Sequence, residues 1–473
     1  MRITWAVAAL CAGLAAANAA RFSPWPAAAA LACGRAPCAL AVAGWWWGSR
    51  RLHALDRSVL LPRVGTAERA LVETQETSRA GRFDVRVRAL VLRFGALRPH
   101  EQVQLRLPAG RAPPRGARLS LVGVVRLPNA PIPGLHVVLK AKSWRRVGMR
   151  GGIAGAGDAI ERRLAQGSAT GLSGERRAVL QAIVVGRTQG LGDGLLADFR
   201  ASGLYHVLAV DGLKVTTVAA AAAALVLYLG AGRVLAELAA LSAIGAYALA
   251  AGLRPSVVRA AVAAALASLA WLTARERDRW HALAVGAAAL LLWNPAAALD
   301  AGFQLSFAAV ASIFVVAPRV VRFLAGYPVP RGLAQLIGVS TACGLATAPV
   351  TWLQFHQVSV VTIPANVVGV PVVAEMLVLA LVTAAVAPVA PPLAAALARV
   401  NGWGAWFVAG CARTFGGLPG AQVTTPAGAA AVAAGILVVA AYCWPRGRRR
   451  AEARIPPLGE RPPEDRAGAA PAA

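Results

Sequence analysis

The sequence predicts a polytopic α-helical membrane protein with a small β-barrel domain near the amino terminus. Of its 473 residues, 57% are hydrophobic and only 15% are charged, and the mean hydropathy is +0.57. Apolar runs of about 20 residues, the length that crosses a bilayer, recur along most of the chain. Between residues 50 and 147 they give way to short segments that alternate apolar and polar side chains. These observations exclude a soluble globular protein.

The formal net charge of +28 is concentrated in one segment. Residues 50–150 contain 21 basic and 6 acidic residues, so this segment carries a surplus of 15. A surplus of this size favours an anionic partner, either nucleic acid or acidic lipid head groups. The six cysteines are scattered without the paired spacing of a metal site, so we expect small core residues.

Residues 1–48 predict a transmembrane hairpin. An apolar run over residues 1–20 is followed, after a few positions, by a second run over residues 26–47. A cleaved signal peptide is the alternative for the first run, but the second run so close behind it favours two paired helices. The Trp45–Trp47 triplet then forms an aromatic belt at the membrane interface.

Residues 50–147 predict a small OB-like β domain. Strands are expected where apolar and polar residues alternate between Pro and Gly turns, at 83–94, 101–108, 117–128 and 135–144. Folds of the OB type often bind single strands through basic grooves and stacking aromatic side chains. The segment is basic but has few aromatic residues, so direct nucleic-acid binding stays open.

The remaining chain divides into three parts. Residues 151–200 contain two amphipathic segments that are too short and polar to span, which predicts interfacial or re-entrant helices. Residues 201–445 predict the transmembrane domain. Its apolar segments run over 204–229, 233–251, 256–274, 280–299, 301–324, 332–352, 361–387, 390–418 and 427–444. Residues 446–473 begin with basic residues and predict a disordered cytoplasmic tail.

Ionisable residues interrupt the first of these apolar segments. His206, Asp211 and Lys214 lie in a run apolar enough to enter a bilayer, with Gly203 and Gly212 beside them. Charges at membrane depth are costly and normally face a bundle interior or a water-filled path. The glycines predict a break in the helix. A structural Asp211–Lys214 pair on one helix face, at spacing i,i+3, is the equally weighted alternative.

A second polar position contains Asp300 and Gln304. Their i,i+4 spacing presents a carboxylate and an amide on one helix face, and Phe303 and Phe307 repeat the same spacing beside them. This pattern predicts either the polar lining of a translocation path or hydrogen bonds between helices. These residues alone favour the hydrogen bonds slightly.

A third polar position contains His356 and Asn366. Pro364 and Pro371 fall in the same apolar run, which predicts a broken helix of the kind that forms binding sites at membrane depth.

Pro255 is expected in the first turn of another helix. Arg259, one turn deeper, either reaches the interface with its long side chain or faces an anionic polymer.

Signals for enzymatic chemistry are missing from the sequence. It contains no GxxxxGK[ST] nucleotide loop, no HExxH and no GxSxG elbow, and its six histidines are isolated from one another. We therefore expect no catalytic residues, no metal site and no cofactor, and we expect that the protein is not an enzyme.

The polar positions resemble the ComEC family of competence proteins over roughly residues 174–373. The segments that carry the resemblance are GLYHVLAVDGLKV (203–215), PSVVRA (255–260), NPAAALDAGFQLSF (294–307), FHQVS (355–359) and PANVVGVP (364–371). Where the family has Ser and His in the first segment, this chain has Asp211 and Lys214, which introduces a pair of charges. Many members also carry a carboxy-terminal metallo-β-lactamase-like domain. No HxHxDH occurs here, so we expect a form without that domain and a nuclease on another polypeptide.

The resemblance implies an inner-membrane channel that admits single-stranded DNA during natural competence. It implies a multi-pass protein of the bacterial cytoplasmic membrane with the β domain outside. The expected partners are single-stranded DNA, membrane lipid, a DNA receptor, a separate nuclease and a cytoplasmic ATP-driven motor, and homo-oligomerisation stays open. The residues expected along the DNA path are His206, Asp211, Lys214, Arg259, Asp300, Gln304, His356 and Asn366, with helix breaks at Gly203, Gly212, Pro255, Pro364 and Pro371.

Two readings from other classes compete with the channel. A proton- or ion-coupled solute transporter would use Asp211, Lys214 and Asp300 as a relay. An envelope scaffold would use the β domain to bind a protein partner.

Overall fold

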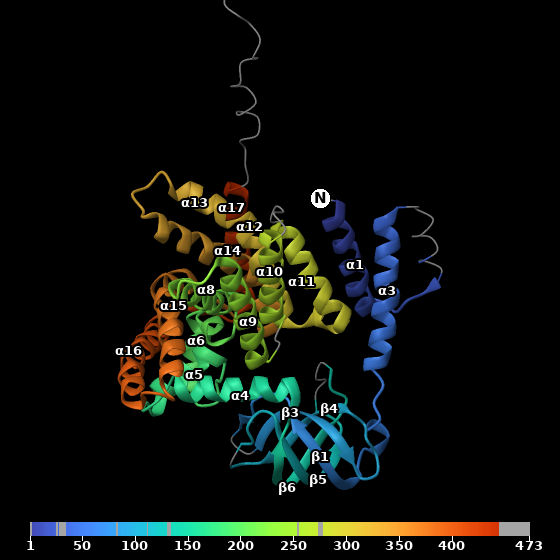
Figure 1. Cartoon of the computed structure of the whole chain (residues 1–473). Coiled ribbons are helices and arrows are strands. Elements are labelled where there is room, and N and C mark those ends of the chain that lie inside the picture. The colour runs from blue at the N-terminus through green and yellow to red at the C-terminus, as the bar shows by residue number, and fades with distance from the viewer. Residues whose placement is uncertain are drawn as a thin grey trace, which may run out of the picture. The chain divides into compact units, whose positions relative to one another are not determined.

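A computed structural model describes residues 2–24, 27, 35–81, 84–110, 112–129, 134–252, 255–272 and 278–443 (Figure 1). The chain divides into two compact units, Met1–Thr425 and Pro426–Ala473. Within the described residues, the second unit consists of helix α17 (Pro426–Cys443). The expected disordered tail at 446–473 lies outside the described residues.

The basic segment forms a closed five-stranded barrel. Its strands are β1 (Ala67–Thr74), β3 (Asp84–Phe94), β4 (Glu101–Pro108), β5 (Ala117–Arg126) and β6 (Val138–Met149), with a short β2 (Arg79–Ala80) paired to β3 and a 3-10 turn η1 (Leu61–Arg63) before β1. The pairing order is β1-β5-β6-β4-β3, and β1 also pairs with β3, which closes the barrel. All of these contacts are antiparallel except the one between β4 and β6.

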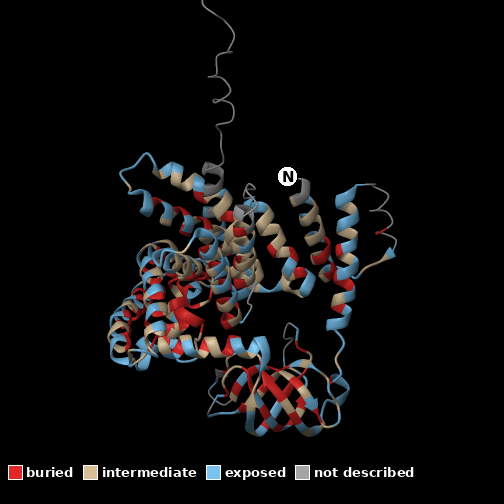
Figure 2. Cartoon of the chain, in the orientation of Figure 1, coloured by how far each residue is buried: buried red, intermediate tan, exposed pale blue. Residues whose placement is uncertain are grey.

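Alternation of side chains explains why this segment closes into a barrel. In β5 every second residue is buried, and β3 follows nearly the same pattern, so each strand presents one apolar face to the interior. The interior is filled by Val, Leu and Ala side chains and by the fully buried Phe94 (Figure 2). The basic side chains therefore lie on the outside. The last strand runs to Met149, beyond the expected strand at 135–144, which adds basic residues to the outer surface.

Helices α1 (Arg2–Ala19) and α3 (Ala36–Leu55) form the expected hairpin. Small residues allow close contact, because a Cβ atom on Gly13 would lie 1.8 Å from the carbonyl oxygen of Ala41. Helix α3 continues past residue 48 towards the barrel. The indole of Trp45 donates to the carbonyl of Ala20, 2.7 Å away, and the indole of Trp47 donates to Leu292. Trp45 thus ties the two helices of the hairpin together, and Trp47 ties the hairpin to the segment at Leu292.

The other helices of the first unit are α4 (Gly152–Gly167), α5 (Gly174–Val185), α6 (Asp193–Ala201), α7 (Tyr205–Leu208), α8 (Gly212–Tyr228), α9 (Arg233–Ala251), α10 (Pro255–Leu272), α11 (Arg279–Trp293), η2 (Pro295–Leu299), α12 (Ala301–Val315), α13 (Ala317–Leu324), α14 (Arg331–Phe355), α15 (Thr362–Val386) and α16 (Pro391–Gly416). Helices α4 to α10, α15 and α16 share one large core (Figure 2). Two short strands, β7 (Val358–Ser359) and β8 (Gln422–Val423), pair with each other.

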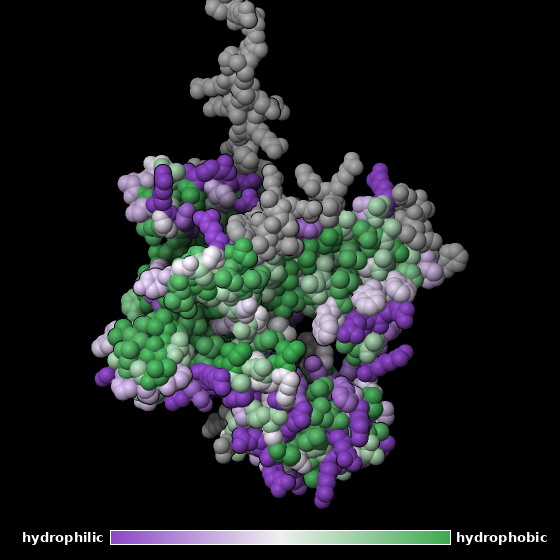
Figure 3. Space-filling model, viewed as in Figure 1, coloured by the Kyte–Doolittle hydropathy of each residue, from purple (hydrophilic) through white to green (hydrophobic). Residues whose placement is uncertain are grey.

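Within the described part of the chain, three helices are long and apolar enough to cross a membrane: α9, α14 and α15. Helices α12 and α13 bend by 42° at their junction and together would make a fourth. Apolar side chains cover much of the helical region in Figure 3, whereas hydrophilic side chains gather on the barrel. The surface is thus divided as expected for a protein with one part in a bilayer and one part in water.

Two expected features of the helices differ in the structure. Helix α15 is continuous from Thr362 to Val386, so Pro364 and Pro371 do not break it. Pro364 lies in the first turn, where no backbone donor is needed, and Pro371 lies inside the helix and removes a single hydrogen bond. We expected α4 to be an interfacial or re-entrant helix with its polar face exposed. Its acidic residues Asp158 and Glu161 are instead buried.

Candidate functional site

One end of the helical region faces the barrel. The guanidinium of Arg115, in the loop before β5, donates to the carbonyl oxygens of Ala250 at 2.5 Å and Leu249 at 3.2 Å, at the end of α9. Helix α8 pairs with α9 across a short turn, and α10 begins just after α9 ends. The start of α8, the end of α9 and the start of α10 therefore lie at this barrel end.

The first expected break occurs at the barrel end, between α7 and α8. Residues 209–211 are non-helical, and Asp211 caps α8 by accepting a hydrogen bond from the backbone nitrogen of Lys214 at 3.1 Å. Lys214 is only 1% exposed, and its ammonium donates to the carbonyls of Val207 at 2.6 Å and Ala209 at 2.8 Å. The carbonyls freed by the break thus gain a charged donor.

Gly203 and Gly212 have different roles at this break. Gly203 has a φ of 79°, and a Cβ atom there would lie 2.2 Å from the hydroxyl of Thr362 at the start of α15. Gly212 is the first residue of α8, and a Cβ atom there would meet only ordinary contacts, the nearest 3.6 Å away on Arg259. Only Gly203 is required by the backbone. His206 is exposed, with its Nδ1 atom 2.9 Å from the carbonyl oxygen of Gly203.

Arg259 joins three helices at this end. Its Nε donates to the hydroxyl of Ser306 in α12 at 2.7 Å, and its guanidinium lies beside Gly212 of α8. It also interacts electrostatically with the Asp211 carboxylate. Pro255 is the first residue of α10, as expected for a proline in the first turn.

The second polar position lies next to Arg259. Asp300 is exposed and caps α12 by accepting from the backbone nitrogen of Phe303 at 3.1 Å. Gln304 donates to the carbonyl of Ala298 at 3.0 Å and accepts from Gln354 of α14 at 3.1 Å. The expected bonds between helices are therefore present. The rings of Phe303 and Phe307 stack with centroids 4.3 Å apart.

The third polar position lies at the turn from α14 to α15. His356 caps the end of α14 in the left-handed region, with a φ of 54°, and its side chain is exposed. Asn366 is 5% exposed, and its Oδ1 has no hydrogen-bond partner among the described residues. On the same face of α15, Gly369 lies against Leu204, so Asn366 faces the region of the α7–α8 break.

The structure thus gathers residues that are far apart in the sequence. Arg259 links α8, α10 and α12, Gln304 links α12 to α14, and Gly203 packs against the start of α15. Helices α8, α10 and α12 begin at the barrel end, so their positive dipole ends gather there. Helix α15 runs the other way, because Ala384 near its end lies against Gly167 of α4. Three helix starts together favour an anion at the barrel end. Among the described residues, no group of three or more His, Cys, Asp or Glu side chains could hold a metal ion.

Glu375 was not identified as a site residue from the sequence. It lies midway along α15 and is exposed on a stripe that also contains Val368, Pro371, Val378 and Val382. A carboxylate at the middle of a candidate membrane span normally faces protein or water rather than lipid. An acidic residue within a long apolar segment is visible in the sequence, so Glu375 could have been predicted as a site residue from the sequence alone.

Comparison with known proteins identifies the family. A family model described as "Competence protein" matches residues 183–449, more than half of the chain. The chain is 31% identical over 193 residues to ComE operon protein 3 of Bacillus subtilis and 27% identical over 225 residues to the uncharacterized protein YcaI of Escherichia coli. These alignments cover 41% and 44% of this chain, and 24% and 28% of those proteins. No solved structure matches the chain.

The family match spans all three polar positions, from the α7–α8 break to the start of α15. The chain belongs to the ComEC family of competence proteins.

Proposed function

We propose that this protein is a multi-pass channel of the bacterial inner membrane that admits single-stranded transforming DNA to the cytoplasm. The observation that carries the proposal is that the three polar positions contact one another, through Arg259 and Ser306, Gln304 and Gln354, and Gly203 and Thr362. Arg259 and the starts of α8, α10 and α12 provide positive potential beside these positions, which attracts a phosphate backbone.

The barrel suits the first contact with the strand. Five strands closed in this order, with one parallel contact, fit a Greek-key barrel of the OB type, a fold used for oligonucleotides. Its basic exterior would hold DNA by attraction to phosphates, which weakens as salt rises.

We propose a barrel outside the cytoplasm because the family resemblance implies it, although Arg50 and Arg51 lie on the barrel side of α3. The helix ends opposite the barrel carry Arg233, Arg319, Arg322 and Arg331. Basic residues in short loops are enriched on the cytoplasmic side. The channel is therefore oriented with the barrel towards arriving DNA. In this proposal a receptor delivers the DNA, a nuclease leaves one strand, and an ATP-driven motor in the cytoplasm supplies the pull.

Transformation of the source organism tests the proposal. A strain without this gene is complemented with the wild type, Asp211→Ala or Arg259→Gln, and purified DNA is supplied. We expect the deletion to abolish recombinants while duplex DNA still reaches a protected state outside the membrane. Arg259→Gln should lower recombinants by about tenfold, the effect of losing one charged hydrogen bond. Arg399→Gln, an exposed arginine on α16, is the matched control and should transform like the wild type.

Unchanged transformation in the deletion strain would contradict the channel, provided that the strain is competent and has no second copy. Proton-coupled solute flux that is lost with Asp300→Asn would instead support a transporter.

A further inference from the structure

A groove crosses three strands on the outside of the barrel. It has a volume of about 290 Å³, and its lining residues come from β1, β5 and β6: Arg69, Ser120, Leu121, Val122, Ser143, Trp144 and Arg145. This size is near the lower end of ligand pockets. The lining includes two arginines and no carboxylate.

The strand register explains how the polar groups share one side of the sheet. Arg69 pairs with Val122 across β1 and β5, and Ser120 pairs with Arg145 across β5 and β6. Paired residues of antiparallel strands point to the same side. Ser120 and Val122 are two positions apart and also share that side. The four residues therefore form two adjacent rows, each with one arginine.

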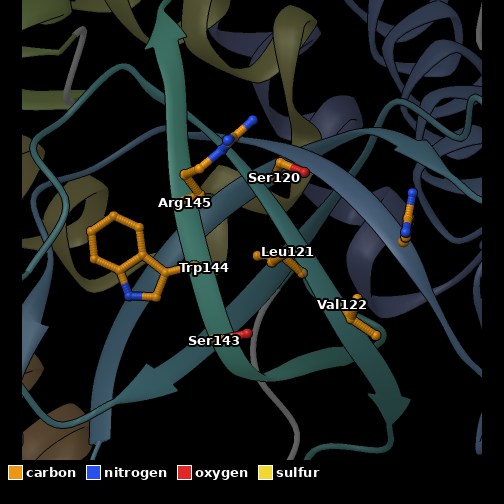
Figure 4. Close-up of a pocket in the computed structure, with 7 residues that line it drawn as sticks. Ser120, Leu121, Val122, Ser143, Trp144 and Arg145 are labelled. Carbon is orange, nitrogen blue, oxygen red and sulfur yellow. The ribbon is translucent and has the colours of Figure 1, made fainter.

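A bulge in β6 shapes the groove. The register shifts between Leu121 and Gly123, so that Val122 faces two residues of β6 instead of one. Bulges bend a strand and redirect its side chains, often next to binding sites. Beyond the bulge, Ser143 and Arg145 point to one side of β6 and Trp144 to the other (Figure 4). Trp144 instead packs against the barrel core.

The two arginines have no partners of their own. Both are exposed, and neither guanidinium makes a hydrogen bond or ion pair within the described part of the chain. Arg118, close by on β5, differs because Glu73 pairs with it at 3.3 Å. Two unpaired cations beside two serine hydroxyls match the groups that contact phosphates in nucleic-acid complexes.

From these observations we propose that the groove binds the phosphate backbone of a single DNA strand, independently of its bases. This inference rests on the proposed function, because the strand is its ligand. Its one aromatic ring, that of Trp144, is half-buried and packs against the barrel core, so we expect little stacking on bases. An anionic lipid surface would be attracted by the same two arginines, and the vesicle measurement below separates it from a DNA strand.

Binding by the purified full-length chain tests the groove. Fluorescence anisotropy is measured with a labelled thymidine oligonucleotide and with an abasic oligonucleotide of equal length, across a series of salt concentrations. We expect Arg69→Gln/Arg145→Gln to weaken binding of both strands about tenfold. The slope of log affinity against log salt should fall by about 1.4, from two contacts at about 0.7 each. Arg98→Gln, an exposed arginine in the β3–β4 loop, is the matched control and should change neither value.

Several outcomes would overturn the groove assignment. They are wild-type affinity in the double variant, loss of affinity for the abasic strand alone, or an effect confined to binding of vesicles that contain anionic lipid. Should the double variant not fold, Arg69→Lys/Arg145→Lys retains both charges and must keep the wild-type salt slope. Wild-type binding together with normal transformation in the groove variants would remove this assignment and leave the channel proposal standing.

Discussion

The charged residues at the α7–α8 break bond mainly to backbone groups. Lys214 is buried, yet its ammonium has two carbonyl partners within the same break, so its charge is stabilised locally. Asp211 acts as a helix cap. The contacts of both residues therefore support a structural role for this pair. Arg259, Gln304 and Asn366 face other helices.

Gly203 and Gly212 give a matched test at the residue scale. Gly203→Ala puts a side chain at positive φ and against Thr362, so we expect destabilisation of about 1–3 kcal/mol and a lower unfolding temperature. Gly212→Ala adds a methyl group in ordinary contact at the start of a helix and should change stability by less than about 0.5 kcal/mol. Thermal unfolding of the two purified variants makes the comparison. Equal unfolding temperatures of the two variants would show that the close contact of Thr362 with Gly203 does not constrain the break.

At the scale of elements, α15 differs most from its expected form. Two prolines in an apolar run predicted a break, but a first-turn proline fits a helix start, and Pro371 costs one hydrogen bond that packing against α16 offsets. The chain instead turns at residues 356–361, where β7 pairs with β8, a contact between segments more than sixty residues apart. Local sequence cannot reveal such a pairing.

The exposed stripe of α15 permits a prediction on water access. If Glu375 faces an aqueous path, a Glu375→Cys variant without the native cysteines should react quickly with a membrane-impermeant thiol reagent. Leu238→Cys, which is exposed on the candidate span α9, should react slowly because it faces lipid. Met376→Cys, beside Glu375 but 3% exposed, should also be protected. Reaction rates in membrane vesicles decide the question, and equal rates at positions 375 and 238 would place Glu375 in lipid.

At the scale of the whole first unit, a buried ionic network attaches the barrel to the helices. Asp158 of α4 is 1% exposed and accepts two hydrogen bonds from Arg150, at 2.6 and 2.8 Å. It also forms an ion pair with Arg115 at 3.0 Å. Arg115 also reaches the end of α9. The barrel is thus held by charges that are desolvated and mutually satisfied, an arrangement that strongly penalises removal of one partner.

Asp158→Asn should therefore loosen the barrel. We expect a loss of about 3–5 kcal/mol, because two guanidinium groups remain buried without their carboxylate. Limited proteolysis should then cut near residues 150–151, between β6 and α4. Asp84→Asn removes the half-buried partner of the exposed Arg86 on the same barrel and should cost no more than about 1 kcal/mol. Identical cleavage of the two variants would contradict a fastening role for Asp158.

The sequence by itself determined most of the elements and the family. Periodicity determined most helices and strands, because side-chain direction repeats every 3.6 residues in a helix and every two in a strand. It did not predict β1, the strand that closes the barrel. The motifs that contain His206, Arg259, Asp300 and His356 determined the family resemblance, which the family match bears out.

Only the tertiary structure decided which of these residues meet. The closure of β1 on β3, the contact of Arg259 with Ser306 and the burial of Asp158 each join distant segments. Their positions depend on packing in three dimensions, which a local pattern of side chains does not encode. The same reason applies to the groove, since its arginines lie on strands far apart in the sequence and become neighbours only when the barrel closes.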